Sequence, residues 1–375
     1  MFAIGIASKK SAARSGTLTL SHGVVETPCF MPIATKGAVK TIDVPDLEAA
    51  GAQIILSNTY HLMLRPGVET LAAMGGLHGL MGWQKPILTD SGGYQVLSLA
   101  AMRKVTDEGV VFRSHIDGSA HLLTPEKSQE VQQAIGSDIA MILDDLVDYP
   151  ATEQQAAAAL ERTLGWAKRQ RVWWDANEKG SRKMFGIVQG STYANLRKRS
   201  AEELIKIGFD GYAHGGLSVG EPRQESYALT ELVNDMLPQD KPRYWMGAGQ
   251  PHEIVEYVKR GCDMFDCVLP TRNARHGTLY VWTDAARLGE GVMNHAPTAG
   301  FYELLHITNE RFTADTGPID ATCGCYTCKN HSRAYVRHLF SVEEPLAQRL
   351  ATIHNVNFYQ ELMRKIREGV TNGTL

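Results

Sequence analysis

The sequence at 265–275, Phe-Asp-Cys-Val-Leu-Pro-Thr-Arg-Asn-Ala-Arg, combines a carboxylate with two guanidinium groups. The apolar residues around Asp266 predict a short buried strand, and Pro270 is expected to end it before a loop that carries Arg272 and Arg275. A carboxylate at the rigid end of a strand can attack a sugar carbon while arginines bind the neighbouring phosphates. An isolated aspartate of this kind more often caps the strand end, so the prediction depends on the rest of the chain.

Three further polar residues stand at corresponding places, each at the end of a short apolar segment: Asp90, Asp144 and Gln189. Four such groups at one end of a barrel would be unfavourable to bury unless a ligand or a proton relieved them. A retaining glycosyl transfer uses two carboxyl groups roughly 5 Å apart, one as nucleophile and one as general acid and base. Asp266 and Asp90 are the candidates for these roles.

A planar heterocycle could be held between the aromatic ring of Tyr94 and the thioether of Met246. Ordinary core packing is the commoner role for both residue types. Glycines at 92, 93, 215 and 216 would let the backbone approach such a ligand closely. The sequence contains no G-x-G-x-x-G after a strand, no Walker loop and no H-E-x-x-H. These absences argue against nicotinamide, nucleoside-triphosphate and zincin chemistry.

A C-x-C-x2-C pattern is formed by Cys323, Cys325 and Cys328. Three thiolates so close together predict a metal site, and a closed tetrahedral site needs a fourth ligand. His354 is the best candidate, and His331 and His338 are alternatives. The sequence therefore predicts one structural Zn²⁺ ion per chain, with free reduced cysteines as the alternative.

Seven short apolar segments that could position these residues lie at 53–58, 86–93, 139–145, 184–190, 211–216, 244–249 and 263–270. Amphipathic stretches at 152–174, 193–207 and 251–260 predict helices between several of them, the first with a Thr152 and Gln155 capping box. Apolar strands that alternate with helices predict a parallel sheet covered on both faces. Polar residues at the ends of many strands favour a (β/α)8 TIM-type barrel over an open sheet, and we expect this α/β barrel to span residues 1–320.

The pattern changes at about residue 321, where the cysteine cluster is followed by helix-like stretches at 332–340 and 357–367. We predict a zinc-binding subdomain at 321–375 whose helices pack on the barrel.

Composition limits the class of protein. The chain has 375 residues, 43% of them hydrophobic, and a formal net charge of -3. It contains no apolar stretch of about 18 residues and no signal-peptide core, so we expect a cytoplasmic protein without membrane spans. Six cysteines in a chain of this length do not indicate a disulfide framework. With this net charge, a polyanionic partner would have to bind local cationic patches.

Five ordered motifs resemble the tRNA-guanine transglycosylases of the queuosine pathway: DSGGYQV at 90–96, FGIVQGS at 185–191, GGLSVGE at 215–221, the 265–275 sequence, and the three cysteines with a distant histidine. The resemblance extends from 58–67 to 353–363. It implies a TIM-type barrel with a zinc subdomain, a homodimer in bacterial members, and exchange of guanine at the wobble position of G-U-N tRNAs (Asp, Asn, His and Tyr type) for a 7-deazaguanine.

The resemblance also implies residue roles. Asp266 would attack C1′ of the wobble ribose, and Asp90 would transfer protons to and from the bases. Asp144 would accept hydrogen bonds from the N–H edge of the base, and Gln189 and Gly216 would donate to its carbonyl oxygen. The rest of the base pocket would be Ser91, Gly92, Gly93, Tyr94, Leu217, Glu221 and Met246. The expected RNA contacts are Gly247, Ala248, Gly249, Gln250, Pro251, His252, Glu253, Thr271, Arg272, Asn273, Ala274 and Arg275.

The sequence gives conflicting evidence on which base enters. Leu146, where bacterial relatives tend to have cysteine, and Ser218 resemble the eukaryotic users of queuine. Val219 stands where the eukaryotic pattern has glycine, and its branched side chain would occupy space that the queuine substituent needs. We therefore favour 7-aminomethyl-7-deazaguanine.

Other differences from the family concern the periphery of the protein. The stretch 283–309 is longer than expected, the chain ends at Leu375, earlier than in many relatives, and His331 replaces a large aromatic residue. Two alternative functions are a nucleoside or glycoside hydrolase with the same two aspartates and a non-catalytic tRNA-binding subunit. The presence of both Asp266 and Asp90 argues against the second.

Overall fold

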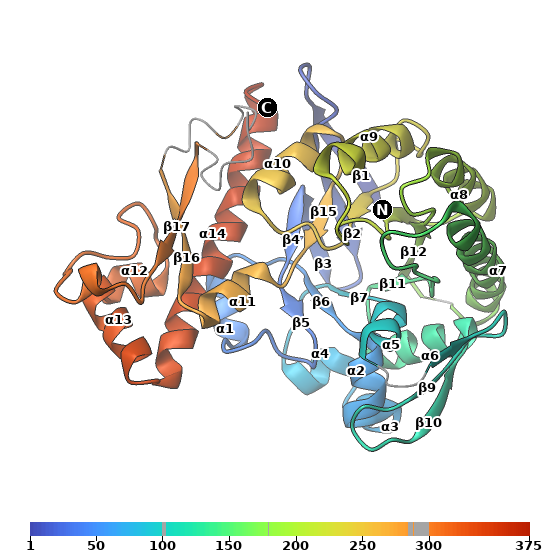
Figure 1. The fold of residues 1–375 in the computed structure, drawn as a ribbon, viewed down its shortest axis with the longest axis horizontal. Coiled ribbons are helices and arrows are strands. Elements are labelled where there is room, and N and C mark those ends of the chain that lie inside the picture. Colours follow the sequence, from blue (N-terminus) through green and yellow to red (C-terminus); the bar gives the residue numbers. More distant parts are fainter. Residues whose placement is uncertain (100–102, 179, 284–287, 289–299) are drawn as a thin grey trace.

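The computed structural model describes residues 1–99, 103–178, 180–283, 288 and 300–375. A parallel sheet that curves into a barrel forms its centre (Figure 1). The strands follow one another around the sheet as β4 (Cys29–Met31), β15 (Met264–Asp266), β14 (Arg243–Trp245), β13 (Gly211–His214), β12 (Lys183–Val188), β11 (Ile139–Met141), β7 (Ile87–Thr89), β6 (Ile55–Ser57) and β5 (Ile33–Ala34).

The barrel closes through its first strand, which is interrupted. β4 pairs with β15 and β5 pairs with β6, both in parallel, and only Pro32 separates β4 from β5. Proline has no N–H to donate to a sheet, but the Pro32 carbonyl still accepts a hydrogen bond from the Leu56 N–H at 3.0 Å. If β4 and β5 are counted as one strand, the barrel has eight strands, which confirms the predicted (β/α)8 class.

The predicted barrel helices are confirmed. They are α7 (Glu153–Asn177), with the Thr152 and Gln155 capping box, α8 (Ala194–Ile207) and α10 (Pro251–Lys259). Together with α9 (Arg223–Asn234) they follow successive strands and cover the outside of the barrel (Figure 1). The connections after β5, β6 and β7 carry six further helices: α1 (Val44–Ala49), α2 (Thr59–Leu62), α3 (Val68–Ala73), α4 (Gly76–Met81), α5 (Gly93–Leu99) and α6 (Pro125–Ile135).

Two small antiparallel sheets accompany the barrel. The first consists of β1 (Phe2–Ala7), β2 (Arg14–Leu20) and β3 (Gly23–Thr27). Its Leu18, Leu20 and Val25 join the core cluster of the barrel strands, and β3 leads directly into β4. The first sheet therefore packs against the amino ends of the barrel strands. The second sheet lies in the connection between β7 and β11 and consists of β8 (Arg103–Val105), β9 (Val110–Arg113) and β10 (Ala120–Leu123).

The C-terminal part consists of a hairpin and three helices. The hairpin is β16 (Thr278–Trp282) with β17 (Tyr302–His306), and the helices are α12 (Tyr326–Asn330), α13 (Arg333–Ser341) and α14 (Pro345–Thr371). Helix α14, much longer than the predicted 357–367, shares a core cluster with Phe30 of β4 and Phe265 of β15. It therefore packs on the barrel beside the last strand and separates it from α12 and α13 (Figure 1).

The hairpin packs with the helices that follow it. Leu279 and Leu305 share a core cluster with Leu339 and Leu350. The predicted division at residue 320 therefore separates segments that pack together, and it stays a prediction. Most of the stretch 283–309 lies outside the described residues. No helix in the described part of the chain is both long and apolar enough to span a lipid bilayer.

Candidate active site and metal centre

A cavity of about 500 Å³ lies at the carboxyl ends of the barrel strands. Asp90 directly follows β7, Gln189 directly follows β12, Asp266 ends β15, and Asp144 follows β11 after two residues. Because the strands are parallel, their carboxyl ends meet at one end of the barrel. All four side chains line the cavity, as the sequence predicted.

Asp90 is held by three donors. Its Oδ2 accepts a hydrogen bond from Asn58 Nδ2 at 2.5 Å, and its Oδ1 accepts from the backbone N–H groups of Thr59 and Gly92, both at 3.1 Å. Burial raises the pKa of Asp90 to about 7, against the lowering effect of these hydrogen bonds, and the nearby charge of Asp266 raises it further. A carboxyl group with this pKa can both donate and accept a proton near neutrality.

Asp266 has two donors on a single oxygen. The Tyr244 hydroxyl and the Gly247 N–H donate to Oδ1 at 2.5 and 2.9 Å. Burial raises the pKa of Asp266, and both hydrogen bonds oppose this effect by stabilising the carboxylate. The two bonds fix the orientation of the carboxylate at the wall of the cavity.

Asp144 and Gln189 form a polar pair across two adjacent strands. Gln189 Nε2 donates to Asp144 Oδ2 at 2.6 Å, and the Ser91 hydroxyl lies 3.4 Å from Oδ1. Burial raises the pKa of Asp144 to about 6 despite these contacts. Gly216 lies against this pair with a positive φ of 66°, and a Cβ there would come within 2.4 Å of Gln189 Oε1. Glycine is therefore required at this position.

Tyr94 and Met246 both line the cavity. Tyr94 is 57% exposed, which excludes ordinary core packing for this residue, and Met246 packs partly against the core. The predicted sandwich of a heterocycle between them stays a prediction. Gly92 lines the same cavity and Gly93 follows it, and a Cβ at either position would lie 3.1 Å from a backbone atom.

Glu221 controls the backbone of the 217–219 loop. Its carboxylate accepts hydrogen bonds from the Ser218 N–H at 2.6 Å, the Val219 N–H at 3.0 Å and the Ser226 hydroxyl. Burial alone would raise the pKa of Glu221, but these hydrogen bonds lower it below its usual value. Because the N–H and C=O of a trans peptide point in opposite directions, the Leu217 carbonyl points away from Glu221. Leu217 and Val219 line the cavity.

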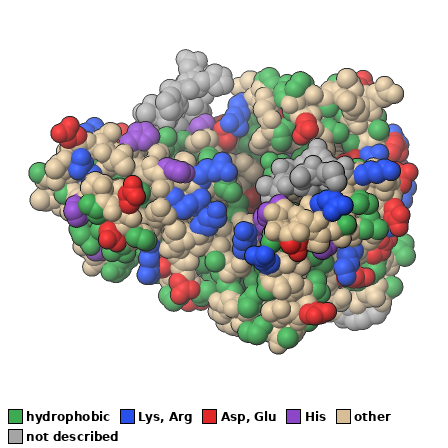
Figure 2. Space-filling model, turned by 60° about the horizontal axis from the view of Figure 1, so that its bottom comes forward, with side chains coloured by type: hydrophobic (Ala, Val, Ile, Leu, Met, Phe, Trp, Pro, Cys, Tyr) green, Lys and Arg blue, Asp and Glu red, His purple; other side chains and the backbone are tan. Residues whose placement is uncertain are grey.

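Cationic side chains border the cavity. Arg272 lines it, and His61, also in the wall, has a pKa lowered to about 4 by burial and by the nearby Lys36, His115 and Lys40. Figure 2 shows Lys and Arg side chains gathered between the C-terminal part, on the left, and the barrel. These lysine and arginine side chains give this side of the molecule the local positive charge that a polyanion site requires, whereas the neutral His61 adds none.

The segment after Asp266 is a helix, so the predicted loop is wrong. Helix α11 (Leu269–Arg275) begins with Pro270 in its first turn, a position that suits proline because the N–H is not needed there. Arg272 is exposed and Thr271 and Ala274 are buried. Further contacts along the helix join Asn273 to the Tyr280 hydroxyl at 2.7 Å and Arg275 to the Thr271 carbonyl at 2.8 Å.

The other predicted RNA segment, 247–253, is mostly packed inside the protein. Ala248, Pro251 and Glu253 are buried, and Glu253 forms an ion pair with Arg223 at 2.5 Å. Gln250 is the N-cap of α10. The Gly249 carbonyl accepts from Tyr359 of α14, and His252 Nδ1 lies 2.8 Å from the Tyr302 hydroxyl. This segment therefore joins α10 to the C-terminal part, and its contact with RNA stays a prediction.

Four residues of the site were not predicted: Asn58, Thr59, His61 and Tyr244. Asn58 directly follows β6, as Asp90 follows β7, so the rule that identified the aspartates applied to it as well. Tyr244 lies two residues before Met246, on the same side of its strand.

The three cysteines come together beside α14, which carries His354. Their ligand atoms all lie within 4.8 Å of one another, with His354 Nδ1 3.3 Å from Cys328 Sγ and 3.8 Å from Cys325 Sγ. His354 Nε2 lies 2.7 Å from the Tyr280 carbonyl. A proton on Nε2 donated to that carbonyl leaves Nδ1 free to bind a metal. The cluster could hold a metal ion. Of the three candidate histidines, His354 belongs to the cluster, and His331 and His338 do not.

Comparison with known proteins agrees with this geometry. The sequence pattern of the family described as Queuine tRNA-ribosyltransferase matches residues 9–375. A Queuine tRNA-ribosyltransferase of Thioalkalivibrio sulfidiphilus is 53% identical over 364 residues, covering 97% of this chain and 92% of the relative. The protein of the same name from Zymomonas mobilis is 48% identical over 374 residues, covering 99% and 92%. The chain belongs to the queuine tRNA-ribosyltransferase family.

Proposed function

We propose that this chain exchanges guanine at the wobble position of tRNAs with a G-U-N anticodon for a 7-deazaguanine, through a covalent glycosyl-enzyme. The observation that carries the proposal is that Asp266 and Asp90 line one cavity together with the Asp144 and Gln189 pair. Two carboxyl groups serve the sugar chemistry, and the polar pair serves the recognition of the base.

The first half of the reaction uses Asp266 as nucleophile. Both hydrogen bonds that described residues donate to Asp266 reach Oδ1, so we assign Oδ2 as the attacking oxygen. Oδ2 forms a bond to C1′ of the ribose while the bond from C1′ to N9 of guanine breaks. The leaving guanine takes the proton of Asp90, whose pKa of about 7 keeps a large protonated fraction at neutral pH.

The second half reverses these steps with a different base. The Asp90 carboxylate takes the proton of the incoming deazaguanine, whose nitrogen attacks C1′ and displaces Asp266 from the ester. The positive charge of Arg272 at the cavity wall, with Lys36 and Lys40 close to the neighbouring His61, supports binding of the tRNA phosphates.

Base recognition follows from the donors and acceptors in the cavity. The Asp144 carboxylate accepts hydrogen bonds from the N–H edge of a guanine-like base, an edge that adenine lacks. The Gln189 amide has two N–H donors and uses one on Asp144, so the second is available to the base carbonyl together with the Gly216 N–H. The target nucleotide must leave its stack to reach this depth.

The 217–221 loop favours 7-aminomethyl-7-deazaguanine. The Leu217 carbonyl points away from Glu221, and an oxygen acceptor in the wall suits the ammonium group of this base. Val219, which lines the same cavity, occupies space that the larger queuine substituent would need.

We assign the ion of the Cys323, Cys325, Cys328 and His354 cluster as one structural Zn²⁺ per chain. Three thiolates and one imidazole are a typical closed set for this ion, and a closed site supplies folding free energy rather than a reactive water. We further propose a cytoplasmic homodimer, as the resemblance implies for bacterial members, and a division near residue 320.

The test is incubation with an unmodified G-U-N tRNA and labelled guanine, followed by measurement of label in the tRNA. Exchange of label requires both tRNA binding and a reversible covalent step. Release of guanine without incorporation of a base would indicate a hydrolase, and tRNA binding with neither reaction would indicate a non-catalytic subunit. Either result would contradict the proposed transferase.

A further inference from the structure

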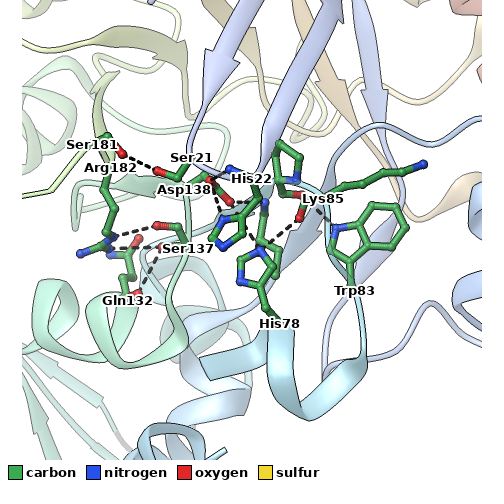
Figure 3. Close-up of polar contacts among 12 residues, drawn as sticks. Ser21, His22, His78, Trp83, Lys85, Gln132, Ser137, Asp138, Ser181 and Arg182 are labelled. Carbon is green, nitrogen blue, oxygen red and sulfur yellow. Dashed lines mark hydrogen bonds and ion pairs between the residues drawn. The ribbon is translucent and has the colours of Figure 1, made fainter. Parts of the chain in front are cut away.

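A second group of metal-binding side chains lies at the opposite end of the barrel from the active site (Figure 3). His22 lies in the turn between β2 and β3, His78 lies on α4, and Asp138 directly precedes β11. Because Asp138 precedes the strand that Asp144 follows, the two aspartates lie at opposite ends of the barrel. None of the three residues takes part in the proposed reaction.

The distances between the three side chains suit one small cation. His22 Nδ1 lies 2.9 Å from Asp138 Oδ1, His78 Nε2 lies 3.6 Å from Asp138 Oδ2, and the three ligand atoms all lie within 4.8 Å of one another. Ligands bound to one tetrahedral ion at distances of about 2.0–2.2 Å are about 3.4 Å from each other. The two separations from Asp138 fall on both sides of this value, so side-chain movements that include a turn of the His22 ring would close the site.

The carboxylate is held in place by the backbone. Asp138 is 1% exposed and accepts hydrogen bonds from the backbone N–H groups of His22 at 3.1 Å and Ile87 at 2.9 Å. The neighbouring Arg182 donates to the Ser137 carbonyl at 2.7 Å (Figure 3). It also donates to Glu178 at 2.9 Å. The hydrogen bonds of the Arg182 guanidinium therefore go to groups other than the Asp138 carboxylate.

The two imidazoles stack on each other in front of this carboxylate. Their ring centroids lie 3.7 Å apart with an interplanar angle of 22°. His78 Nε2 also lies 3.1 Å from the Lys85 carbonyl oxygen, so an ion bound to Nε2 would replace the proton shared with that oxygen and could take the oxygen as a further ligand. Two protonated rings this close would repel each other strongly, whereas one divalent cation satisfies both nitrogens and the carboxylate together.

We propose that His22, His78 and Asp138 form a second metal site, for a divalent cation of borderline softness such as Zn²⁺ or Co²⁺. Two imidazole nitrogens and one carboxylate oxygen are a typical set of three protein ligands for such ions, with a remaining position for water or for the Lys85 carbonyl. The His22 side chain is 39% exposed, which gives the ion access and lets the ring turn toward it. The bound ion links the β2–β3 turn, through His22, to the barrel, through Asp138.

Cobalt binding to the zinc-replete protein tests this site. Equilibrium dialysis with Co²⁺ is expected to load about one further ion per chain, with visible absorption that lacks the sulfur-to-cobalt charge-transfer bands of a cysteine site. His22→Gln is expected to weaken this binding at least about 10-fold, and bound Co²⁺ is expected to raise the unfolding temperature of the wild type but not of this variant. His22 lies on an exposed turn, so the variant is expected to fold.

The control is His338→Gln, which removes an exposed histidine outside both clusters and is expected to bind Co²⁺ like the wild type. If the wild type takes up no additional ion, or if His22→Gln takes up as much as the wild type, the three residues form a hydrogen-bonded cluster and the proposal is wrong. Cobalt bands typical of thiolate ligation would show displacement of zinc from the cysteine cluster, and would also contradict it.

Discussion

The Tyr244 hydroxyl donates a 2.5 Å hydrogen bond to Oδ1 of Asp266, from the neighbouring barrel strand. The Gly247 N–H reaches the same oxygen at 2.9 Å. Burial raises the pKa of Asp266, and the hydrogen bond from Tyr244 lowers it. The same bond directs Oδ2, the other carboxylate oxygen, to the cavity. Tyr244 is thus a positioning residue for the proposed nucleophile.

Tyr244→Phe is expected to slow formation of the covalent adduct about 10- to 100-fold at neutral pH, the effect of losing a hydrogen bond to a charged group worth about 1.5–3 kcal/mol. The pKa of Asp266 should rise further, so the deficit of the variant relative to wild type at the same pH should become smaller at higher pH. Single-turnover adduct formation measured between pH 6 and 9 checks this expectation. A variant with an unchanged rate and pH profile would show that Tyr244 has no positioning role.

The pKa of Asp90, raised by burial to about 7, predicts the pH dependence of guanine release. The protonated form is present below this pH and is lost above it. Release of guanine should therefore slow about tenfold per pH unit well above pH 7, because the leaving base needs the proton. Asp90→Ala should be slow at every pH and should lack this decline. A wild-type rate that stays constant up to pH 9 would exclude Asp90 as the general acid.

The raised pKa of Asp144 predicts a change in stability with pH. Because burial raises this pKa from 3.8 to about 6, the folded state binds the proton more tightly than the unfolded state. The contribution of Asp144 to stability is therefore greatest at low pH, and it falls as the pH rises from about 4 to about 6.

Asp144→Asn should remove this pH dependence. The free energy of unfolding of the variant relative to wild type should increase by up to about 3 kcal/mol between pH 4 and pH 7, since one pKa unit corresponds to about 1.36 kcal/mol. Urea unfolding at both pH values measures this difference in free energy. Asp107→Asn, which changes a fully exposed side chain, is the control. An equal difference at both pH values would mean that the buried carboxylate does not titrate in this range.

Removal of the metal should unfold the C-terminal part first. His354 lies on α14, which packs on the barrel, and its Nε2 contacts Tyr280 of the hairpin, so the cysteine cluster and His354 join the cysteine segment, α14 and the hairpin. We expect metal analysis to find about one zinc per chain and chelation to lower the unfolding temperature. His354→Ala should weaken zinc retention more than His331→Ala or His338→Ala. Full activity after complete removal of zinc would contradict a structural role.

Val219 should decide between the two candidate bases. Its side chain lines the cavity and is 37% exposed. Because this side chain occupies space that the queuine substituent needs, the wild type is expected to have a higher kcat/KM for 7-aminomethyl-7-deazaguanine than for queuine. Val219→Gly should shift the ratio of the two kcat/KM values toward queuine by about 10-fold or more, because overpacking costs about 1–3 kcal/mol. Leu146→Cys serves as the comparison, because it replaces a residue that resembles the users of queuine with the one that bacterial relatives tend to have. A wild-type preference for queuine would refute this argument.

The sequence predicted the strand-end residues because local rules suffice for them. Asp90, Asp144, Gln189 and Asp266 each follow or end an apolar segment, and the parallel arrangement brings such ends together without further information. The first barrel strand was not predicted because Pro32 interrupts its pattern.

Contacts between distant segments could not be predicted in the same way. Glu253 was expected to contact RNA, but it is buried and pairs with Arg223, which lies on another helix. His22 and Asp138 are 116 residues apart, and neither has a local motif that indicates a metal ligand. Only the arrangement of the β2–β3 turn beneath β11 brings them together.

The covalent step at Asp266 is the central claim, and trapping of a protein–RNA adduct tests it most directly. Wild-type protein and an unmodified G-U-N tRNA, denatured without an incoming base, should give an adduct that survives denaturation. Asp266→Asn should give none while still binding the tRNA, because an amide cannot form the glycosyl ester. An adduct of normal yield in Asp266→Asn would show that another residue is the nucleophile.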